Sequence, residues 1–486
     1  MTTKAEWERR QSAFLERIGE ASLADLERGT IVVLPSASFP VEELTKITGI
    51  QHYEERMLFT MLFLANPETR IVYLTSLPVD EAVIEYYLRF VPDPDAARRR
   101  LLFHSLGDPS PVCLTEKLLA RPEAVAAMRG LVEDPDDAYV LPFNITNGEW
   151  ALAEALGLPL YGGHSDLAEL GSKTGSRRVA RQAGVAVLEG REGLYTIEEL
   201  ESAVRAIQAR RPAAEAVVAK LNDGFSGQGN AIIELAGPVP PFPLDSSATT
   251  FCAAGESWPA FSAKMAQRGA VVEELVRHKT MVSPSVQLRV APGGTVEVLS
   301  THDQILGGPD NQVYLGCRFP ADESYRLAIQ EAGTKVSALL AAEGVLGSFG
   351  VDFVVMPSAG GAAGHEIYLS EINLRMGGTS HPFWMARLAT GGVYDPATGQ
   401  LRVEDGVRTY VASDNLKSQR LVGKTPADVI EAVDKAGLAF DPISRTGATL
   451  HLLGALRGFG KMGLTCVAES LDEADELYRE VVATVS

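Results

Sequence analysis

The sequence predicts a protein of mixed α/β and α+β class, in which an N-terminal α/β domain precedes two α+β lobes and a small C-terminal α+β domain. Three observations lead to this prediction. The chain has 486 residues, which corresponds to about three domains or lobes. Apolar strand patterns alternate with helical patterns up to about residue 165. Paired strands joined by glycine-rich turns then replace that alternation.

Residues 1–165 are expected to fold around a parallel sheet, because strands that alternate with helices usually pair in parallel. Buried strands are predicted at 29–36, 70–78 and 138–146, and helices at 1–28, 79–90 and 115–131. No G-x-G-x-x-G follows these strands, so this domain carries no sequence signal for a dinucleotide site.

Residues 166–410 are predicted to form the second unit, with one lobe at 166–280 and another at 281–410, and residues 411–486 form the third. In the second unit we expect helices at 172–184, 196–210 and 324–344, strands at 185–190, 214–221, 231–235, 269–276, 350–355 and 365–373, and a strand pair at 285–301. In the third unit we expect a helix at 426–437, a strand at 448–453 and a final helix at 472–485.

The composition is acidic, with 44 Lys plus Arg against 63 Asp plus Glu and a net charge of −19. This field repels a polyphosphate backbone, so nucleic acid is not expected as a partner, although a local pocket can still be positive. The four cysteines lie far apart, and the charged N-terminus lacks the apolar stretch of a signal peptide. Apolar runs are too short to span a bilayer. We therefore expect a cytoplasmic protein that does not bind membranes.

A glycine-rich stretch, NDGFSGQGN at residues 222–230, lies between two expected strands. Glycines let the backbone turn tightly and let its N–H groups approach a ligand. Lys220 precedes the stretch and sits among apolar residues, where an ammonium needs an anionic partner or an exit to water. A lid over an anionic ligand and a plain hairpin turn are both compatible with this pattern.

Two other features lie nearby in the sequence. Lys173 begins an expected helix, a position where a cation is disfavoured unless an anion also binds there. The segment VVEELV places Glu273 and Glu274 in an apolar strand. For Lys173 the alternative is a solvated lysine. For the acid pair the alternative is that one acid points outward and the other caps a neighbour. The functional interpretation of the strand is a hinge whose backbone C=O and N–H groups hydrogen-bond to the edge of an adenine base.

The segment SEINLRMGG places Glu371, Asn373 and Arg375 at every second position of a strand, so that they share one face. Asp352 lies in the preceding expected strand, and a hairpin would bring it beside Glu371. Two acids this close repel unless a cation lies between them. Carboxylate and amide oxygens suit Mg²⁺, and an arginine forks onto a phosphoryl or carboxylate group. The alternative is a surface ion-pair face on an edge strand.

Polar residues around the last strands are candidates for substrate contact. They are His302, Gln304, Arg318 and His381. His381 is also the candidate general base. For each of them, a satisfied polar residue in a loop is an equally good interpretation.

Together, the helix-start lysine, the lysine with its glycine-rich hairpin, the EE segment and the D…E-x-N-x-R set resemble the ATP-grasp superfamily over residues 166–410. Residues 1–165 look like the pre-ATP-grasp domain that accompanies it. The segment GATLHLLGALRGFGKMGLTCVAES, at residues 447–470, resembles the C-terminal domain of the pheganomycin-type peptide ligases. The whole chain is therefore similar to that peptide ligase group.

This resemblance implies roles for individual residues. Lys173 and Lys220 would contact phosphates, and the lid would comprise Gly224, Ser226, Gly227, Gln228 and Gly229. The adenine hinge would comprise Glu273, Glu274, Leu275 and Val276, and Mg²⁺ would be held by Asp352, Glu371 and Asn373. Arg375 would lie near the transferred phosphoryl group. Many members place a ribose-binding acid beyond the hinge, but residues 277–285 read RHKTMVSPS, which leaves ribose contact to another residue such as Glu274 or Ser283.

The activity that the resemblance implies is ATP-dependent amide or peptide bond formation through an acyl phosphate. The implied cofactors are ATP and two Mg²⁺ ions, with Mn²⁺ as a substitute, and the substrates are a small carboxylate and the amine of an amino acid or peptide. Specialised, antibiotic-type peptide biosynthesis is the expected setting. The alternatives are a different acceptor, such as a thiol or another amine, and a non-catalytic nucleotide-binding regulatory module. The oligomeric state is open, with a homodimer as one candidate.

Overall fold

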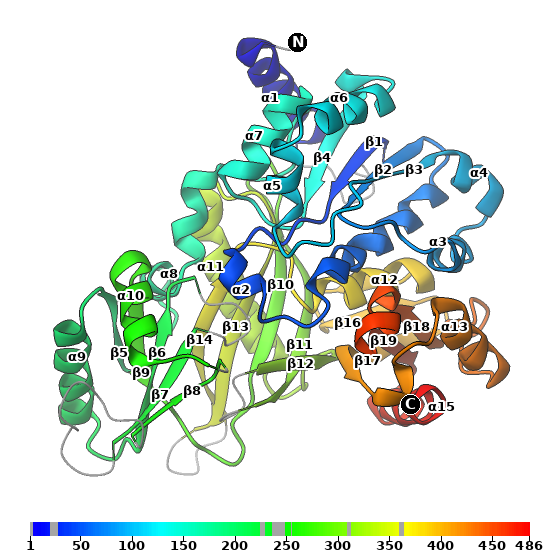
Figure 1. Cartoon of the computed structure of the whole chain (residues 1–486). Coiled ribbons are helices and arrows are strands. Elements are labelled where there is room, and N and C mark those ends of the chain that lie inside the picture. The colour runs from blue at the N-terminus through cyan, green and yellow to red at the C-terminus, as the bar shows by residue number, and fades with distance from the viewer. Residues whose placement is uncertain are drawn as a thin grey trace.

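The computed structural model describes residues 3–19, 28–223, 229–235, 248–253, 255–308, 313–358 and 364–486. Three sheets organise this part of the chain, with the N-terminal sheet at one end of the central sheet and the C-terminal elements beside it (Figure 1). Four residues of the expected lid, Gly224, Ser226, Gly227 and Gln228, lie outside the described residues. Their predicted role stays a prediction.

The N-terminal sheet is parallel throughout, as predicted, with the order β3–β2–β1–β4. Its strands are β1 (Gly29–Leu34), β2 (Thr69–Thr75), β3 (Leu101–Ser105) and β4 (Ala138–Pro142). The sequence analysis missed β3, because its LLFHS sequence is short and only Leu101 is fully buried. Its helices are α1 (Lys4–Ile18), α2 (Val41–Leu44), α3 (Glu81–Leu88), α4 (Pro94–Arg99), α5 (Leu114–Leu119), α6 (Pro122–Leu131) and α7 (Asn147–Leu156), with the 3₁₀ helix η2 at Ile50–Ala65.

Both faces of this sheet are buried, because successive side chains of a strand point to opposite sides and helices cover each side. Val32 and Leu34 of β1 belong to the core formed with α5, α6 and α7, whereas Ile31 and Val33 belong to the core formed with η2. The other side of η2 packs on the central part of the molecule, where Phe59 stacks on Trp384 of α12 (Ser380–Thr390) with 6.1 Å between ring centroids. Helix η2 therefore links the N-terminal domain to the rest of the chain.

A five-stranded antiparallel sheet follows, with the order β5–β9–β6–β7–β8. Its strands are β5 (Gly190–Leu194), β6 (Ala216–Leu221), β7 (Asn230–Glu234), β8 (Thr249–Phe251) and β9 (Ala270–Glu274), and its helices are α8 (Lys173–Gln182), α9 (Ile197–Arg210) and α10 (Trp258–Arg268). The strand expected at 185–190 was placed wrongly. Val185 and Leu188 are apolar because they are buried outside the sheet, and the strand begins only at Gly190.

The central sheet has ten strands, with β14–β13–β10–β11–β12–β17–β16–β15 on its path and β19 and β18 joined to β17. The bounds are β10 (Pro284–Val290), β11 (Val296–Gly307), β12 (Val313–Phe319), β13 (Gly347–Pro357), β14 (His365–Asn373), β15 (Val393–Asp395), β16 (Gln400–Val403), β17 (Gly406–Lys417), β18 (Gly447–His451) and β19 (Lys461–Ala468). Its helices are α11 (Arg326–Ala342), α12, α13 (Pro426–Lys435), α14 (Leu456–Phe459) and α15 (Leu471–Val485). The predicted boundary at residue 410 falls inside β17, so the C-terminal strands extend the central sheet.

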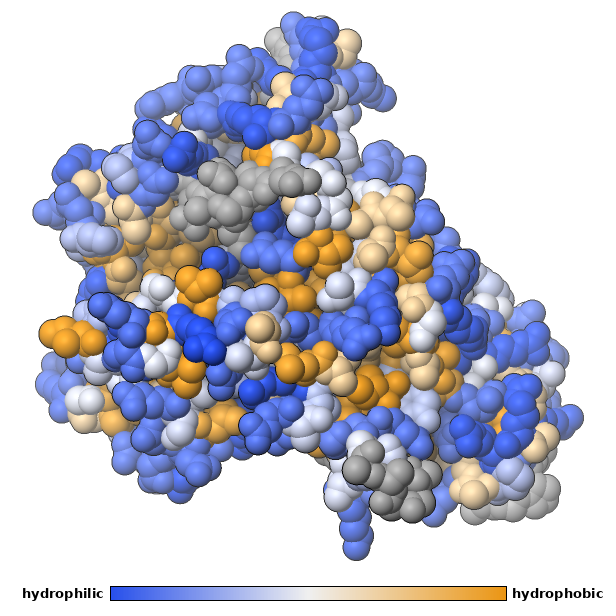
Figure 2. Space-filling view, turned by 180° about the vertical axis from the view of Figure 1, so that it is seen from behind, coloured by the Kyte–Doolittle hydropathy of each residue, from blue (hydrophilic) through white to orange (hydrophobic). Residues whose placement is uncertain are grey.

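On the face in Figure 2, hydrophilic side chains dominate the outer contour and hydrophobic ones are interspersed among them. Among the described residues, no helix combines the length and apolar character needed to cross a membrane.

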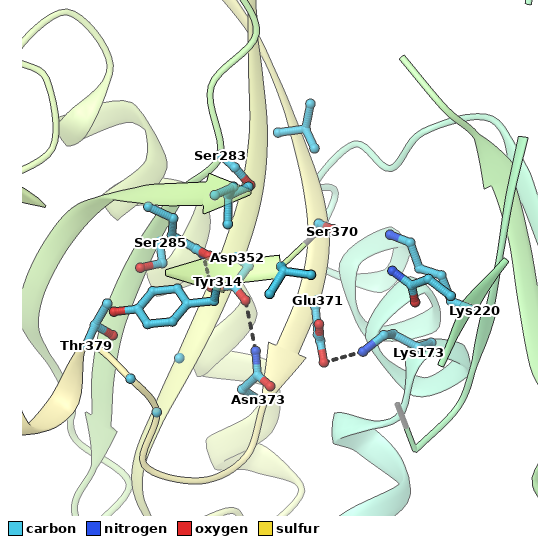
Figure 3. Close-up of a pocket in the computed structure, with 18 of the residues that line it drawn as sticks. Lys173, Lys220, Ser283, Ser285, Tyr314, Asp352, Ser370, Glu371, Asn373 and Thr379 are labelled. Carbon is cyan, nitrogen blue, oxygen red and sulfur yellow. Dashed lines mark hydrogen bonds and ion pairs between the residues drawn. The ribbon is translucent and has the colours of Figure 1, made fainter. Parts of the chain in front are cut away.

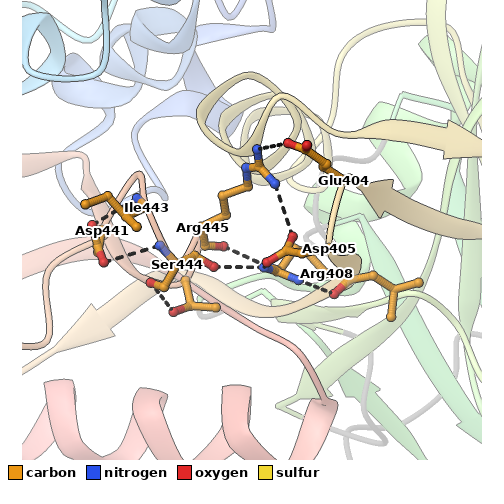
Figure 4. A network of polar contacts seen from close by, with 9 residues as sticks. Glu404, Asp405, Arg408, Asp441, Ile443, Ser444 and Arg445 are labelled. Carbon is orange, nitrogen blue, oxygen red and sulfur yellow. Dashed lines mark hydrogen bonds and ion pairs between the residues drawn. The ribbon is translucent and has the colours of Figure 1, made fainter.

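A buried arginine joins β17 to the loop that precedes β18 (Figure 4). Arg408 is 1% exposed, yet its donors reach four acceptors. Its Nη2 lies 2.9 Å from Asp405 Oδ2 and 2.8 Å from the Ser444 carbonyl, and its Nε lies 3.1 Å from the Arg445 carbonyl. Its Nη1 donates to the Val407 carbonyl at 2.9 Å. A buried charge is tolerated when it is paired and hydrogen-bonded in this way.

We predict that Arg408→Met lowers the free energy of unfolding by about 2 kcal/mol, because it leaves three carbonyl groups without this donor and Asp405 with Arg445 alone. The matched control is Arg402→Met, since Arg402 is about half exposed in its 2.7 Å pair with Asp395 and should change stability by less than about 1 kcal/mol. Denaturant unfolding followed by circular dichroism measures both. Equal effects of the two substitutions would contradict the prediction.

Candidate functional site

A cleft of about 330 Å³ lies where the five-stranded sheet, the central sheet and η2 meet. Figure 3 shows that Lys173 and Lys220 face Asp352, Glu371 and Asn373 across it. Most of the predicted site residues that the structure describes line this cleft. They are Lys173, Lys220, Glu273, Glu274, Leu275, Val276, Gln304, Asp352, Glu371, Asn373 and Arg375.

The register of β13 and β14 places Asp352 directly opposite Glu371, which confirms the predicted hairpin. Burial raises the pKa of Asp352 to about 7, and the neighbouring charge of Glu371 adds to the rise. Two amide donors partly offset this repulsion. Gln304 Nε2 donates to Asp352 Oδ1 at 2.9 Å, and Asn373 Nδ2 donates to Asp352 Oδ2 at 2.9 Å.

Lys173 reaches the acid pair from the other side of the cleft. It is the first residue of α8, whose N-cap Ser172 accepts a hydrogen bond from Gly175 N. Its ammonium forms an ion pair with Glu371. The sequence left open a solvated lysine or a lysine that binds a phosphate at this helix start. In this structure the carboxylate of Glu371 is its partner, and phosphate contact stays a prediction.

Lys220 is held in a second charge cluster. Its ammonium forms an ion pair with Glu273 on the neighbouring strand β9, and Arg177 Nη1 lies 2.9 Å from the other carboxylate oxygen. Burial opposes the charged form of Glu273, but the charges of Lys220 and Arg177 outweigh it and lower the pKa of the carboxyl. The sequence analysis missed Arg177, because an arginine inside a helix pattern ordinarily lies at the surface.

Arg375 follows the end of β14 and lies between the acid pair and the N-terminal domain. Its Nη2 donates to Asn373 Oδ1 at 2.8 Å, and its guanidinium lies 5.4 Å from the centroid of the Phe39 ring. Burial is the main cause that lowers its pKa; Glu371 and Asp352 oppose this shift, and Arg56 adds to it. Arg375 therefore has the two acids Glu371 and Asp352 as neighbours, and also a second cation, Arg56.

Three predicted substrate or catalytic residues do not line the cleft. His302 is fully buried with its Nε2 2.6 Å from the Tyr410 hydroxyl, and burial lowers its pKa to about 3. His381 lies at the start of α12, a helix that the sequence analysis did not expect, with its Nε2 2.8 Å from His451 Nε2, and burial lowers its pKa well below the ordinary value. Arg318 pairs with Asp475 at 3.0 Å. Of the four candidates, only Gln304 has a place in the cleft.

The cleft has further lining residues that no sequence motif marked. Among them are Tyr53 and Arg56 from η2, Asp414 and Lys417 from β17, and Lys461 from β19. Lys461 and Lys417 lie in the C-terminal unit, which the sequence analysis linked only to a family resemblance. Their place in the cleft follows from strand β17, which carries that unit into the central sheet.

Comparisons with known proteins agree with this architecture. Residues 428–481 match the family described as PGM1 C-terminal domain, and residues 244–395 match the family described as IQCH-like, ATP-grasp. The chain is 31% identical over 467 residues to the L-propargylglycine–L-glutamate ligase of Streptantibioticus cattleyicolor, an alignment that covers 94% of each chain. It is 20% identical to the IQ motif-containing protein H of Danio rerio, of which it spans 47%.

Solved structures share the fold at low sequence identity. A biotin carboxylase complex with β,γ-ATP from Campylobacter jejuni aligns with a TM-score of 0.58 and 14% identity, over 95% of this chain and 92% of that chain. Carboxyaminoimidazole ribonucleotide synthase from Aspergillus clavatus, complexed with ATP, aligns with a TM-score of 0.52 and 13% identity, over 95% and 100%. On the similarity to the curated ligase, and with both family matches in agreement, this chain belongs to the ATP-grasp ligases that carry a PGM1-type C-terminal domain.

Proposed function

We propose that this protein joins a carboxylate to the amine of an amino acid or peptide, with ATP as the energy source. The observation that carries the proposal is the opposed pair of Asp352 and Glu371, set in one cleft with Lys173, Lys220 and Arg375. The similarity to a ligase that acts on L-propargylglycine and L-glutamate supports amino acids as substrates. A cytoplasmic location is part of the proposal, because the reaction consumes ATP. A role in specialised peptide biosynthesis is proposed from the similarity to the same ligase.

The nucleotide would lie along the five-stranded sheet. Lys173 and Lys220 would contact its phosphates, and the segment Glu274, Leu275 and Val276 would read the adenine edge. The residues at 224–229 would cover the triphosphate. Glu273 has a different part in this proposal, because its two oxygens already pair with Lys220 and Arg177. It orients the Lys220 ammonium toward the cleft.

The acid pair fits Mg²⁺, because its side chains offer carboxylate and amide oxygens, the donors that this ion prefers alongside phosphate oxygens. We propose Asp352, Glu371 and Asn373 as its ligands, with two ions per site and Mn²⁺ as a substitute. Bound Mg²⁺ neutralises charge on the transferred phosphoryl group. Among the described residues, no cluster of three or more His, Cys, Asp or Glu side chains is placed to hold a metal ion. This donor set therefore relies on substrate oxygens to complete it.

The proposed reaction has two steps. The substrate carboxylate attacks the γ-phosphoryl group, and ADP leaves. The amine then attacks the carbonyl carbon of the acyl phosphate, inorganic phosphate leaves and the amine loses a proton. Arg375 can fork onto the phosphoryl or carboxylate oxygens, and the lysines compensate for the triphosphate charge. Since water would hydrolyse the acyl phosphate, the cleft must exclude it during reaction.

Phosphate release from MgATP tests the proposal and separates it from its alternatives. The panel comprises pairs of the standard L-amino acids together with L-propargylglycine, and mass spectrometry identifies the product. Release that requires both members of a pair, with a new amide of the summed mass less water, supports the ligase. Release that requires a thiol acceptor, or nucleotide binding without turnover under any pair, would overturn it.

We predict that Glu371→Gln lowers ligation turnover about 100-fold, because a neutral amide is a weaker ligand than a carboxylate for the Mg²⁺ that would neutralise phosphoryl charge. The matched control is Glu366→Gln on the same strand, outside the residues that line the cleft, which should retain wild-type turnover. Thermal unfolding of both variants separates a loss of chemistry from a loss of fold. Near wild-type turnover in Glu371→Gln would remove the acid pair from the mechanism.

We also predict that Glu273→Gln lowers the free energy of unfolding by about 3 kcal/mol, because it removes the anion that two buried cations share. Lys220 then loses its carboxylate partner, and Arg177 keeps only Glu192, 3.2 Å away. Its neighbour Glu274 is the control, since it is 20% exposed and lies 3.5 Å from Arg211, so that Glu274→Gln should cost less than about 1 kcal/mol. Denaturant midpoints report stability, and the KM for ATP reports the orientation of Lys220. Equal stability of the two variants contradicts this reading of the cluster.

A further inference from the structure

One end of the cleft gathers basic side chains that the proposed ATP and Mg²⁺ sites do not use. Arg56 comes from η2, Lys417 from the end of β17 and Lys461 from the start of β19, and all three line the cleft. We call these three residues the basic subsite. Lys46 also lines the cleft, but its 2.8 Å ion pair with Glu43 cancels its charge.

Lys461 is the most constrained member of the basic subsite. It is 2% exposed. Its ammonium donates to the Tyr53 hydroxyl at 2.6 Å and lies 4.6 Å from the centroid of that ring. Burial lowers its pKa to about 7, and the charges of Arg56 and Lys417 act in the same direction. Among the described residues, neither Lys461 nor Lys417 forms an ion pair with a carboxylate.

Arg56 is only partly satisfied. It is 8% exposed and pairs with Asp414 through Nη2, but its buried Nε has no hydrogen-bond partner among the described residues. A buried donor without a partner is costly and uncommon in folded proteins. When Lys417 and Lys461 are both protonated, counting Asp414 against the three cations leaves a net charge of +2 in a protein whose overall charge is −19.

Arg70 and Arg129 also have a buried Nε without a partner among the described residues, but neither of them lines the cleft. All the side-chain nitrogens of Arg408 reach an acceptor, and Lys220 shares Glu273 with Arg177. Lys220 thus has a carboxylate partner, whereas Lys417 and Lys461 form no ion pair with a carboxylate among the described residues. The basic subsite is therefore better explained by a missing anion than by a role in the fold.

The position of the basic subsite indicates which anion it takes. Lys173 pairs with Glu371 of the acid pair, whereas Arg375 donates to Asn373, which in turn donates to Asp352. Arg56 is close enough to Arg375 for its charge to lower the pKa of that guanidinium. The charge of Arg56 also lowers the pKa of Lys461, so these three side chains are neighbours. The basic subsite thus adjoins Arg375, whereas Lys173 and Lys220 pair with the carboxylates of Glu371 and Glu273.

We propose that Arg56, Lys417 and Lys461 bind a carboxylate of an amino acid substrate that does not react and remains free in the product. This inference rests on the proposed ligase function and adds the class of substrate: an amino acid recognised by a free carboxylate. Two lysines and an arginine that line the cleft provide charge-assisted donors for two carboxylate oxygens. The carboxylate belongs either to the amino acid that supplies the amine or to a second acid group on the one that is phosphorylated.

The test uses the amino acid pair with the greatest phosphate release in the panel above, and the corresponding primary amides. One arm replaces the amine-supplying amino acid by its α-carboxamide. The other arm replaces a second carboxylate on the activated amino acid by its amide, as L-glutamine or isoglutamine replaces L-glutamate. The arm in which wild-type KM rises about 10- to 100-fold identifies the source of the carboxylate.

Lys461→Met should raise the KM for that acid by a similar factor, leave the KM for ATP unchanged and abolish the preference for acid over amide. Lys461→Arg should restore most of the preference, since it keeps the charge. Lys417 is exposed, so Lys417→Met folds without difficulty and should weaken the preference to a smaller extent. The control is Lys435→Met on α13, where the lysine is 73% exposed and pairs with Glu431; its kinetics should match the wild type.

Two outcomes would overturn the proposal. In one, Lys461→Met and Lys417→Met discriminate acid from amide as strongly as the wild type. In the other, the KM for ATP rises in parallel with that for the amino acid, which would assign the basic subsite to phosphate. A wild-type enzyme that turns over no pair of the panel instead contradicts the ligase function itself, so the two failures are distinguishable.

Discussion

The mutual repulsion of Asp352 and Glu371 is the constraint on which the rest of the cleft depends. Strand register holds these carboxylates opposite each other, and burial with the neighbouring charge raises the pKa of Asp352 to about 7. Such a pair is unfavourable for folding unless positive charge or hydrogen-bond donors compensate for it. In this structure the ammonium of Lys173 and the amides of Gln304 and Asn373 provide that compensation.

The same side chains can exchange partners when substrates bind. A divalent cation between the acids would free Lys173 for a phosphate oxygen, without leaving an uncompensated charge behind. Lys220 is prepared differently, because Glu273 and Arg177 fix its position in a buried cluster. In the basic subsite only Arg56 has an anionic partner, Asp414, so an incoming carboxylate would improve its electrostatics. In the cleft without ligands, the acid pair is therefore placed for a cation, and the lysines and the basic subsite are placed for anionic groups.

Local patterns predicted much of this protein and its site. The alternation of polar residues in SEINLR, together with a hairpin, placed Asp352 beside Glu371, and the apolar strands of the N-terminal domain predicted a parallel sheet. Long-range packing was not accessible in the same way. Nothing near His302 or His381 in the sequence shows that Tyr410 and His451 satisfy them. Arg56 and Lys461 are separated by most of the chain and meet only because η2 and β19 converge on the cleft.

The most direct measurement of the central claim is anomalous scattering from crystals grown with Mn²⁺ and a non-hydrolysable ATP analogue. The account predicts a manganese peak bonded to Asp352 and Glu371, with triphosphate oxygens completing its coordination and Lys173 moved onto a phosphate. A triphosphate bound elsewhere, with both carboxylates still held by Lys173, Gln304 and Asn373 and no metal between them, would contradict it.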